Sequence, residues 1–122
     1  MQHNVGIVRD ENEMLSALDH LKIFWERATR VGVIGNRDFN PGWHTALDLK
    51  NLLTVSEAIT RAALERKESR GAQFREDYPN KDERFATVNT VIRKAADGGM
   101  EVQLAPLPEM PDYLKQVIEA MK

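Results

Sequence analysis

The sequence predicts a mainly α-helical domain with a small β part. Three observations support this fold class. Apolar residues recur at helical spacing over about 10–30, a leucine- and alanine-rich segment follows over about 41–70, and two runs over 86–105 that favour β-structure flank a glycine-rich turn. We therefore expect two long antiparallel helices to form most of the domain, with a hairpin packed beside them.

The first helix is expected over about residues 10–30. Asp10 and Glu13 have the spacing of a capping box at its start. The apolar side chains that follow alternate by steps of four and three, so they share one face of the helix. They are Met14, Leu18, Leu21, Trp25 and Ala28. This face predicts a partner helix, and it places Trp25 in the core rather than at a ligand.

A second helix is expected over about 41–70, after a connector rich in glycine and asparagine. Asn40 and Pro41 have the residue types of an N-cap and a first-turn proline. The apolar residues of this helix cover more than one face, so we expect it to contact two neighbours. They are Leu49, Leu52, Leu53, Ile59 and Leu64. Gly71 is expected to end the helix in a left-handed cap.

The remainder predicts a charged loop over 71–85, a β-hairpin over 86–105 with its turn at 97–99, and a helix over 110–121. The apolar residues of this last helix lie on one face. They are Tyr113, Leu114, Val117, Ile118 and Met121. Together the elements predict one domain over 1–122, an antiparallel helical bundle of spectrin-repeat-like form with a small β-hairpin and a short C-terminal helix.

Charge and composition exclude several classes of function. The net charge of −2 supplies no basic field for nucleic acid. The absence of cysteine excludes a disulfide, a Cys-ligated zinc site and a Cys-ligated iron–sulfur cluster. No apolar run approaches the ~20 residues that cross a bilayer. We therefore expect no nucleic-acid partner, no direct membrane insertion and no redox centre within this chain.

No group of residues has the spacing of a catalytic or metal site. The histidines lie far apart in the sequence, at His3, His20 and His44. Ser56 and Ser69 stand in no hydrolase motif. Glu76 and Asp77 are adjacent carboxylates in a charged loop, where pairing with nearby arginines or exposure to water is expected instead of acid–base catalysis.

Residues 65–79, with the sequence ERKESRGAQFREDYP, resemble a signature near the C-terminus of succinate dehydrogenase and fumarate reductase flavoprotein subunits. Asn4–Arg9 (NVGIVR) and Leu47–Ala58 (LDLKNLLTVSEA) also agree with that family. The resemblance extends through Asp82, and the hairpin and last helix look like one bacterial style of tail. The family usually has histidine where Gln73 stands, and an amide does not titrate, so no proton-transfer role carries over to that position.

The resemblance implies that the chain is the C-terminal domain of a larger subunit, with no catalytic, cofactor-binding or metal-binding residue of its own. In the family, flavin-binding and capping domains precede this region and hold the FAD and the dicarboxylate. The parent would interconvert succinate and fumarate and pass electrons through FAD to an iron–sulfur subunit. We therefore expect this region to be inactive alone, and Met1 to lie within a longer reading frame.

The resemblance also implies the partners and the location. The expected partners are the flavin-binding and capping domains of the same chain, the iron–sulfur subunit and the membrane anchor subunits. The parent would be cytoplasmic and peripheral to the inner face of the cell membrane through those subunits.

The charged segment around 68–77 is the expected interdomain docking surface. By composition alone a solvated loop is favoured, but ordering such a loop is costly unless it contacts something. The resemblance reverses the preference, because the family repeats this pattern where the helical domain meets the flavin-bearing part. The candidates are Glu68, Ser69, Arg70, Gly71, Arg75, Glu76 and Asp77. Arg70 and Arg75 are expected to pair with carboxylates across that junction.

Two alternatives belong to other classes of function. The first is a freestanding helical interaction module that binds a partner protein through Trp43 and the charged loop. A reading frame that continues upstream of Met1 through a flavin-binding domain would exclude it. The second is a small enzyme, which needs a polar pocket with converging titratable groups, and the sequence offers no such set.

Overall fold

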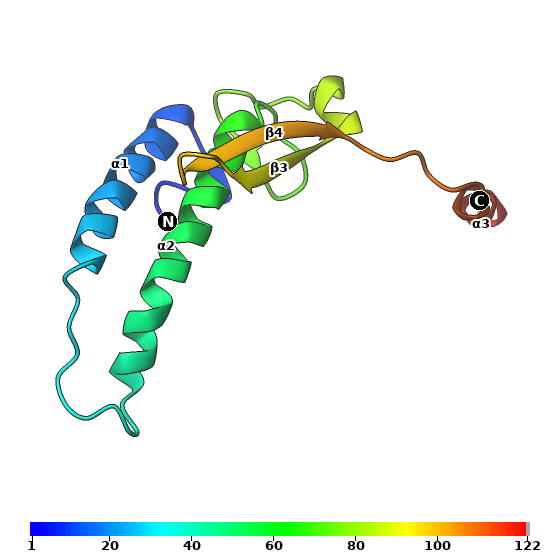
Figure 1. Cartoon of the computed structure of the whole chain (residues 1–122). Helices are drawn as coiled ribbons and strands as arrows, with labels where there is room; N and C mark the ends of the chain where they lie inside the picture. Colours follow the sequence, from blue (N-terminus) through cyan, green and yellow to red (C-terminus); the bar gives the residue numbers. More distant parts are fainter. Residues whose placement is uncertain (122) are drawn as a thin grey trace.

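A computed structural model describes residues 1–121, which form three α-helices, a parallel pair of short strands and an antiparallel hairpin (Figure 1). The elements in chain order are β1 Val8–Arg9, α1 Glu11–Ala28, α2 Pro41–Glu65, β2 Phe74–Arg75, the 3₁₀ helix η1 Glu83–Thr87, β3 Val88–Lys94, β4 Met100–Pro106 and α3 Asp112–Ala120. The predicted fold class, mainly α with a small β part, is confirmed.

Helices α1 and α2 lie side by side and run in opposite directions (Figure 1). The Asp10 side chain caps α1 by accepting a hydrogen bond from the backbone N–H of Glu13 at 2.9 Å, as its spacing predicts. The Asn40 side chain caps α2 by accepting from the N–H of Gly42 at 3.0 Å, and Pro41 opens the helix. The local signals therefore identify both helix starts correctly.

The buried core is small and concentrated between the helices and the N-terminal segment. Its hydrophobic members are Val5, Met14, Ala17, Leu21, Leu53 and Ala63, while Phe85 of η1 is buried separately beside Arg66. Trp25, which the helical pattern assigns to the core, is only half-buried, and it lines a groove with the tip of the hairpin. Helix α2 contacts both α1 and the hairpin, in agreement with the two expected neighbours.

Helix α2 ends at Glu65, several residues before the predicted end at 70. The guanidinium of Arg75 donates to the carbonyls of Ala63 and Leu64, which would accept the next backbone N–H groups if the helix continued. The chain instead turns away at Arg66, which has an extended backbone. The predicted cap at Gly71 is therefore wrong: its φ of +61° serves a separate turn.

The parallel pair β1 and β2 and the helix η1 have no counterpart among the predicted elements. Val8 aligns with Phe74 and Arg9 with Arg75, so the N-terminal segment lies against the loop that follows α2. Strands this short give no period that a sequence pattern can reveal. The loop expected over 71–85 consequently contains a strand and most of a 3₁₀ helix.

The hairpin closes as predicted around residues 97–99, where Gly98 has a φ of +87°. The backbone N–H of Ala95 donates to the carbonyl of Gly99 at 2.9 Å, and the register runs from Lys94 opposite Met100 to Val88 opposite Pro106. The hairpin lies against α2, which supplies the support that an isolated hairpin lacks.

The terminal helix α3 forms where the amphipathic pattern predicts it and stands apart from the rest of the chain (Figure 1). None of its side chains is buried. Within residues 1–121, no helix has the length and apolarity that a bilayer crossing needs, and no cluster of three or more potential metal ligands occurs.

Replacing Met14 tests the helix pair. Its side chain is fully buried between the helices, so Met14→Ala is expected to lower the free energy of unfolding by about 2–4 kcal/mol. Urea unfolding followed by circular dichroism measures the change. The neighbouring Leu15 is 48% exposed, so Leu15→Ala serves as the control and should have a clearly smaller effect. Equal losses in the two variants would contradict the assignment of Met14 to the core.

Candidate functional site

The seven predicted docking residues all lie in the charged loop, which we define as residues 66–82. The loop leaves α2, reverses at a tight turn and returns as β2 beside β1. At the turn the backbone N–H groups of Arg70 and Gln73 each donate to the other residue's carbonyl, at 3.0 and 3.2 Å. Gly71 between them has the left-handed backbone that this reversal requires.

Glu68 is the buried centre of one half of the charged loop. Its carboxylate has no exposed surface and accepts hydrogen bonds from Arg66 at 2.8 Å and from Arg70 at 2.9 Å. It also accepts from the backbone N–H of Asp82 at 2.9 Å. Burial alone would raise the pKa of Glu68, but the hydrogen bonds from Arg70, Asp82 and Arg66 outweigh it, and the pKa is lowered.

Arg75 is the buried centre of the other half. Its side chain has no exposed surface and forms a two-point ion pair with Asp77, at 2.7 Å from Nε and 2.6 Å from Nη2. The hydrogen bond from Arg75 holds the pKa of Asp77 below its usual value, and the same pair raises the pKa of Arg75. Asp77 also accepts from the backbone N–H of Glu11 at 3.2 Å. The pair therefore joins the end of α2 to the start of α1.

Ser69 and Gln73 hold the backbone of the charged loop in place. The Ser69 hydroxyl accepts from the N–H of Arg75 at 2.8 Å and donates to the carbonyl of Tyr78 at 2.9 Å. The Gln73 amide donates to the carbonyls of Arg66 at 2.9 Å and Glu68 at 3.2 Å. Both side chains are thereby structural, and the amide of Gln73 supplies two donors to two carbonyls.

The seven predicted residues differ in their exposure. Glu68 and Arg75 are buried, Ser69 and Arg70 are half-buried, and Gly71, Glu76 and Asp77 are exposed. Glu68 and Arg75 therefore form the interior of the charged loop. Of the two arginines expected to reach across a junction, Arg70 keeps a side chain that is 31% exposed, while Arg75 has none of its surface free.

Arg9 is a cation that the sequence reasoning did not single out. It is half-buried beside Arg75, and within residues 1–121 its side chain makes one hydrogen bond, from Nε to the carbonyl of Gly6 at 2.7 Å. No carboxylate of residues 1–121 forms an ion pair with it. Burial lowers the pKa of Arg9, and the positive charge of Arg75 lowers it further. The place of Arg9 beside Arg75 follows from the pairing of β1 with β2, which no pattern in the sequence predicts.

Two apolar side chains lie exposed next to this cation. Val8 and Phe74 are register partners across the parallel strands and are 51% and 42% exposed. We call Val8, Arg9 and Phe74 the strand-pair patch. Sequence alone could not have joined residues so far apart in the chain, since nothing local signals the pairing.

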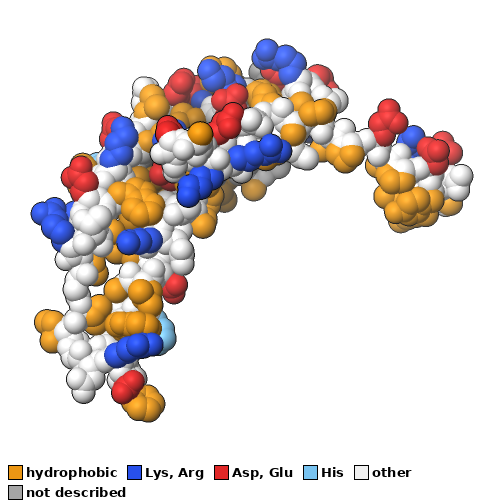
Figure 2. Space-filling model, viewed as in Figure 1, with side chains coloured by type: hydrophobic (Ala, Val, Ile, Leu, Met, Phe, Trp, Pro, Cys, Tyr) orange, Lys and Arg blue, Asp and Glu red, His pale blue; other side chains and the backbone are white. Residues whose placement is uncertain are grey.

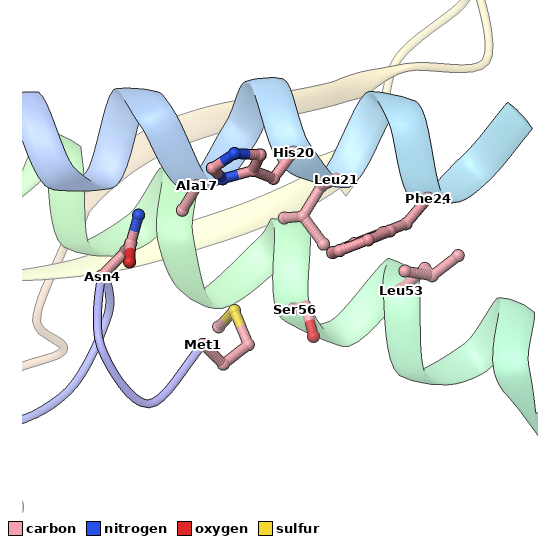
Figure 3. A pocket seen from close by; sticks show the side chains of 8 residues that line it. All are labelled: Met1, Asn4, Ala17, His20, Leu21, Phe24, Leu53 and Ser56. Carbon is pink, nitrogen blue, oxygen red and sulfur yellow. The ribbon is translucent and has the colours of Figure 1, made fainter. Parts of the chain in front are cut away.

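A shallow groove of about 360 Å³ lies between the N-terminal segment, α1 and α2 (Figure 3). Its lining is mainly apolar, and its polar side chains are those of Asn4, His20 and Ser56. Among the described residues, no hydrogen bond joins His20 to Ser56. The groove thus lacks the nucleophile–base pair of a catalytic site.

Removing the buried guanidinium tests the charged loop. Arg75→Met leaves Asp77 and two helix carbonyls without their donor, and we expect the free energy of unfolding to fall by about 3 kcal/mol. Arg84 and Asp82 form an ion pair of the same sequence spacing in which the arginine side chain is 85% exposed. Arg84→Met is therefore the matched control and should leave the urea midpoint nearly unchanged. Similar urea midpoints in the two variants would show that burial of the Arg75–Asp77 ion pair adds nothing to its contribution to stability.

The lowered pKa values of two carboxyl groups predict that the fold loses stability in acid. The folded chain lowers the pKa of Asp77 and Glu68 below their ordinary values of 3.8 and 4.5. Both groups therefore stabilise the fold above those values, and the stabilisation is lost as pH falls through the folded pKa. We expect a level urea midpoint above about pH 5 and a decline below it. In Asp77→Asn the decline should be shallower, and an equally steep decline in that variant would refute the assignment.

Comparison with known proteins places this geometry in a family. The family model described as fumarate reductase flavoprotein C-term matches residues 1–116. The fumarate reductase flavoprotein subunit of Mycobacterium tuberculosis is 32% identical over 108 residues, which are 88% of this chain and 18% of that protein. The succinate dehydrogenase flavoprotein subunit of Coxiella burnetii is 38% identical over 84 residues, 68% of this chain and 14% of that protein.

A solved structure agrees with these relatives. Mycobacterium smegmatis Sdh1 in complex with UQ1 superposes with a TM-score of 0.87 at 38% identity, over 99% of this chain and 21% of that one. The chain thus spans about a fifth or less of the proteins that it resembles. On the match over residues 1–116, the chain belongs to the family of fumarate reductase flavoprotein C-terminal domains.

Proposed function

We propose that the chain is the non-catalytic C-terminal docking domain of an FAD-dependent subunit that interconverts succinate and fumarate. The observation that carries this proposal is the family match over residues 1–116, together with relatives that bear the names fumarate reductase and succinate dehydrogenase flavoprotein subunit.

The chemistry of the parent subunit would then take place in the parts that this chain lacks. FAD and the dicarboxylate are assigned to flavin-binding and capping domains of the same polypeptide. Electrons would pass from the flavin to an iron–sulfur subunit and on to membrane anchor subunits. The parent would be cytoplasmic and peripheral to the inner face of the membrane through those partners.

The docking role is assigned to two parts of the charged end of the domain. The buried ion pairs that Glu68 and Arg75 each form with neighbouring residues hold the charged loop in one conformation. The strand-pair patch, with an unpaired cation beside two exposed apolar side chains, has the composition of an interface. We assign the contact across the junction to Arg9 and to the half-exposed Arg70, each toward a carboxylate, rather than to Arg75.

The helix pair would be completed by a further helix of the parent. One side of α2 exposes large apolar side chains that neither α1 nor the hairpin covers. They are Leu47, Leu52, Val55 and Ile59. An exposed face of this kind supports the spectrin-repeat-like bundle as the arrangement in the whole subunit.

A charge reversal in the full-length subunit tests the docking role. Arg9→Glu places a carboxylate where a cation is proposed to meet one, so we expect the flavin content to fall and succinate-dependent dye reduction to drop at least about tenfold. Flavin absorbance per protein and the initial rate are the two measurements.

Lys50→Glu supplies the matched control, because it makes the same charge change on the exposed surface of α2, away from the charged loop. Its flavin content and rate should equal those of the unaltered subunit. If Arg9→Glu behaves like Lys50→Glu, Arg9 is not part of the junction. If the unaltered subunit neither holds flavin nor acts on succinate or fumarate, the proposed function itself is wrong.

A further inference from the structure

Helix α3 has an apolar face that nothing among residues 1–121 covers. Figure 2 shows hydrophobic side chains gathered on one side of this helix and charged side chains on the other. The apolar side chains are 40–82% exposed. They are Tyr113, Leu114, Val117, Ile118 and Met121. A face this apolar on so short a segment is typical of a docking helix.

The helix also lacks the means to be stable on its own. It has nine residues, whereas isolated helices shorter than ~12–15 residues are marginal in water. Its N-cap is Pro111, which makes no capping hydrogen bond, and its last turn has no basic residue. Within the described part of the chain it has one ion pair, Lys115 with Asp112, which is exposed and worth little. An ordered α3 therefore requires a surface to bind.

The arm that precedes α3 directs it away from this domain. Residues 107–111 contain Pro108 and Pro111 and follow Pro106, so the arm is short and stiff. Its first residue is held to the end of η1, since the N–H of Leu107 donates to the carbonyl of Thr87 at 2.9 Å. Figure 1 shows α3 on the opposite side of the hairpin from α1. The exposed apolar face of the helix pair is therefore not the partner of α3.

The charge of α3 disfavours a lipid surface. Its polar face carries Asp112 and Glu119 against Lys115, and in the sequence Glu109 comes just before the helix and Lys122 just after it, so the segment is not basic. Helices that lie on membranes are usually rich in lysine and arginine on that face. An apolar protein surface suits α3 better.

The comparisons with relatives indicate which protein surface α3 would bind. The superposition on Sdh1 covers 99% of this chain, so it includes residues of α3, yet this chain makes up only 21% of that subunit. The family model likewise reaches residue 116, inside the helix. In that relative, a much larger part of the same polypeptide therefore lies outside the region that matches this domain.

From these observations we propose that α3 is a clamp, which docks its apolar face into an apolar groove on the flavin-bearing part of the same subunit. This inference rests on the proposed function, because it needs that part to be present. The arm and α3 would then hold the subunit together at a second point, on the other side of the hairpin from α1.

Hydrogen exchange in the full-length flavin-loaded subunit tests the clamp. We expect the backbone amides of residues 112–121 to exchange at least about tenfold more slowly in the unaltered subunit than in Ile118→Glu, which puts a charge into the apolar face. Gln116→Glu adds the same charge to the polar face and should keep the slow exchange. Amides of α1 and α2 serve as an internal reference, because their protection should not differ among the three proteins.

Several outcomes would overturn the clamp. The first is unprotected exchange of 112–121 in the unaltered subunit while flavin content and turnover are normal, which would leave the proposed function intact. Protection that depends on protein concentration would assign the face to a second copy. Protection that appears only with anionic lipid vesicles, or only with the iron–sulfur subunit, would assign it to those partners. A subunit that binds no flavin and shows no turnover would contradict the proposed function whatever the exchange of α3, and the clamp, which rests on that function, would fall with it.

Discussion

The buried guanidinium of Arg75 is the interaction on which the rest of this domain depends. It occupies the carbonyls at the end of α2, and through Asp77 it reaches the first backbone N–H of α1. A buried charge is tolerated only when its hydrogen bonds are satisfied, and here carbonyl and carboxylate oxygens meet that need. One side chain thus sets where α2 stops, and through Asp77 it links that end to the start of α1.

Polar contacts are unusually important at this end of the molecule because the apolar core is small. Glu68 provides a second buried charge, and Ser69 and Gln73 tie the backbone between the two. The charged loop is consequently a folded structure with an interior of ion pairs. Such an interior gives the loop one defined shape, and it leaves the side chains of Arg9, Val8 and Phe74 at the surface.

Local patterns predicted the elements that local forces determine. The stripe from Met14 to Ala28, the caps at Asp10 and Asn40 and the turn at 97–99 all depend on neighbours within a few residues. The seven predicted docking residues do gather in one loop, but their docking stays a prediction. The end of α2 and the strand-pair patch were missed, because Arg75 and β1 act on segments remote in the sequence.

The parallel pairing of β1 with β2 has a consequence for the order of folding. Val8 and Phe74 are separated by more than half of the chain, and contacts of such long range form late because a large loop must close first. On the ribosome, β1 emerges well before its partner strand. The helix hairpin can assemble in the meantime, and the addition of the N-terminal strand then completes the strand-pair patch. Under the proposed docking role, assembly with another domain would wait until this domain has folded.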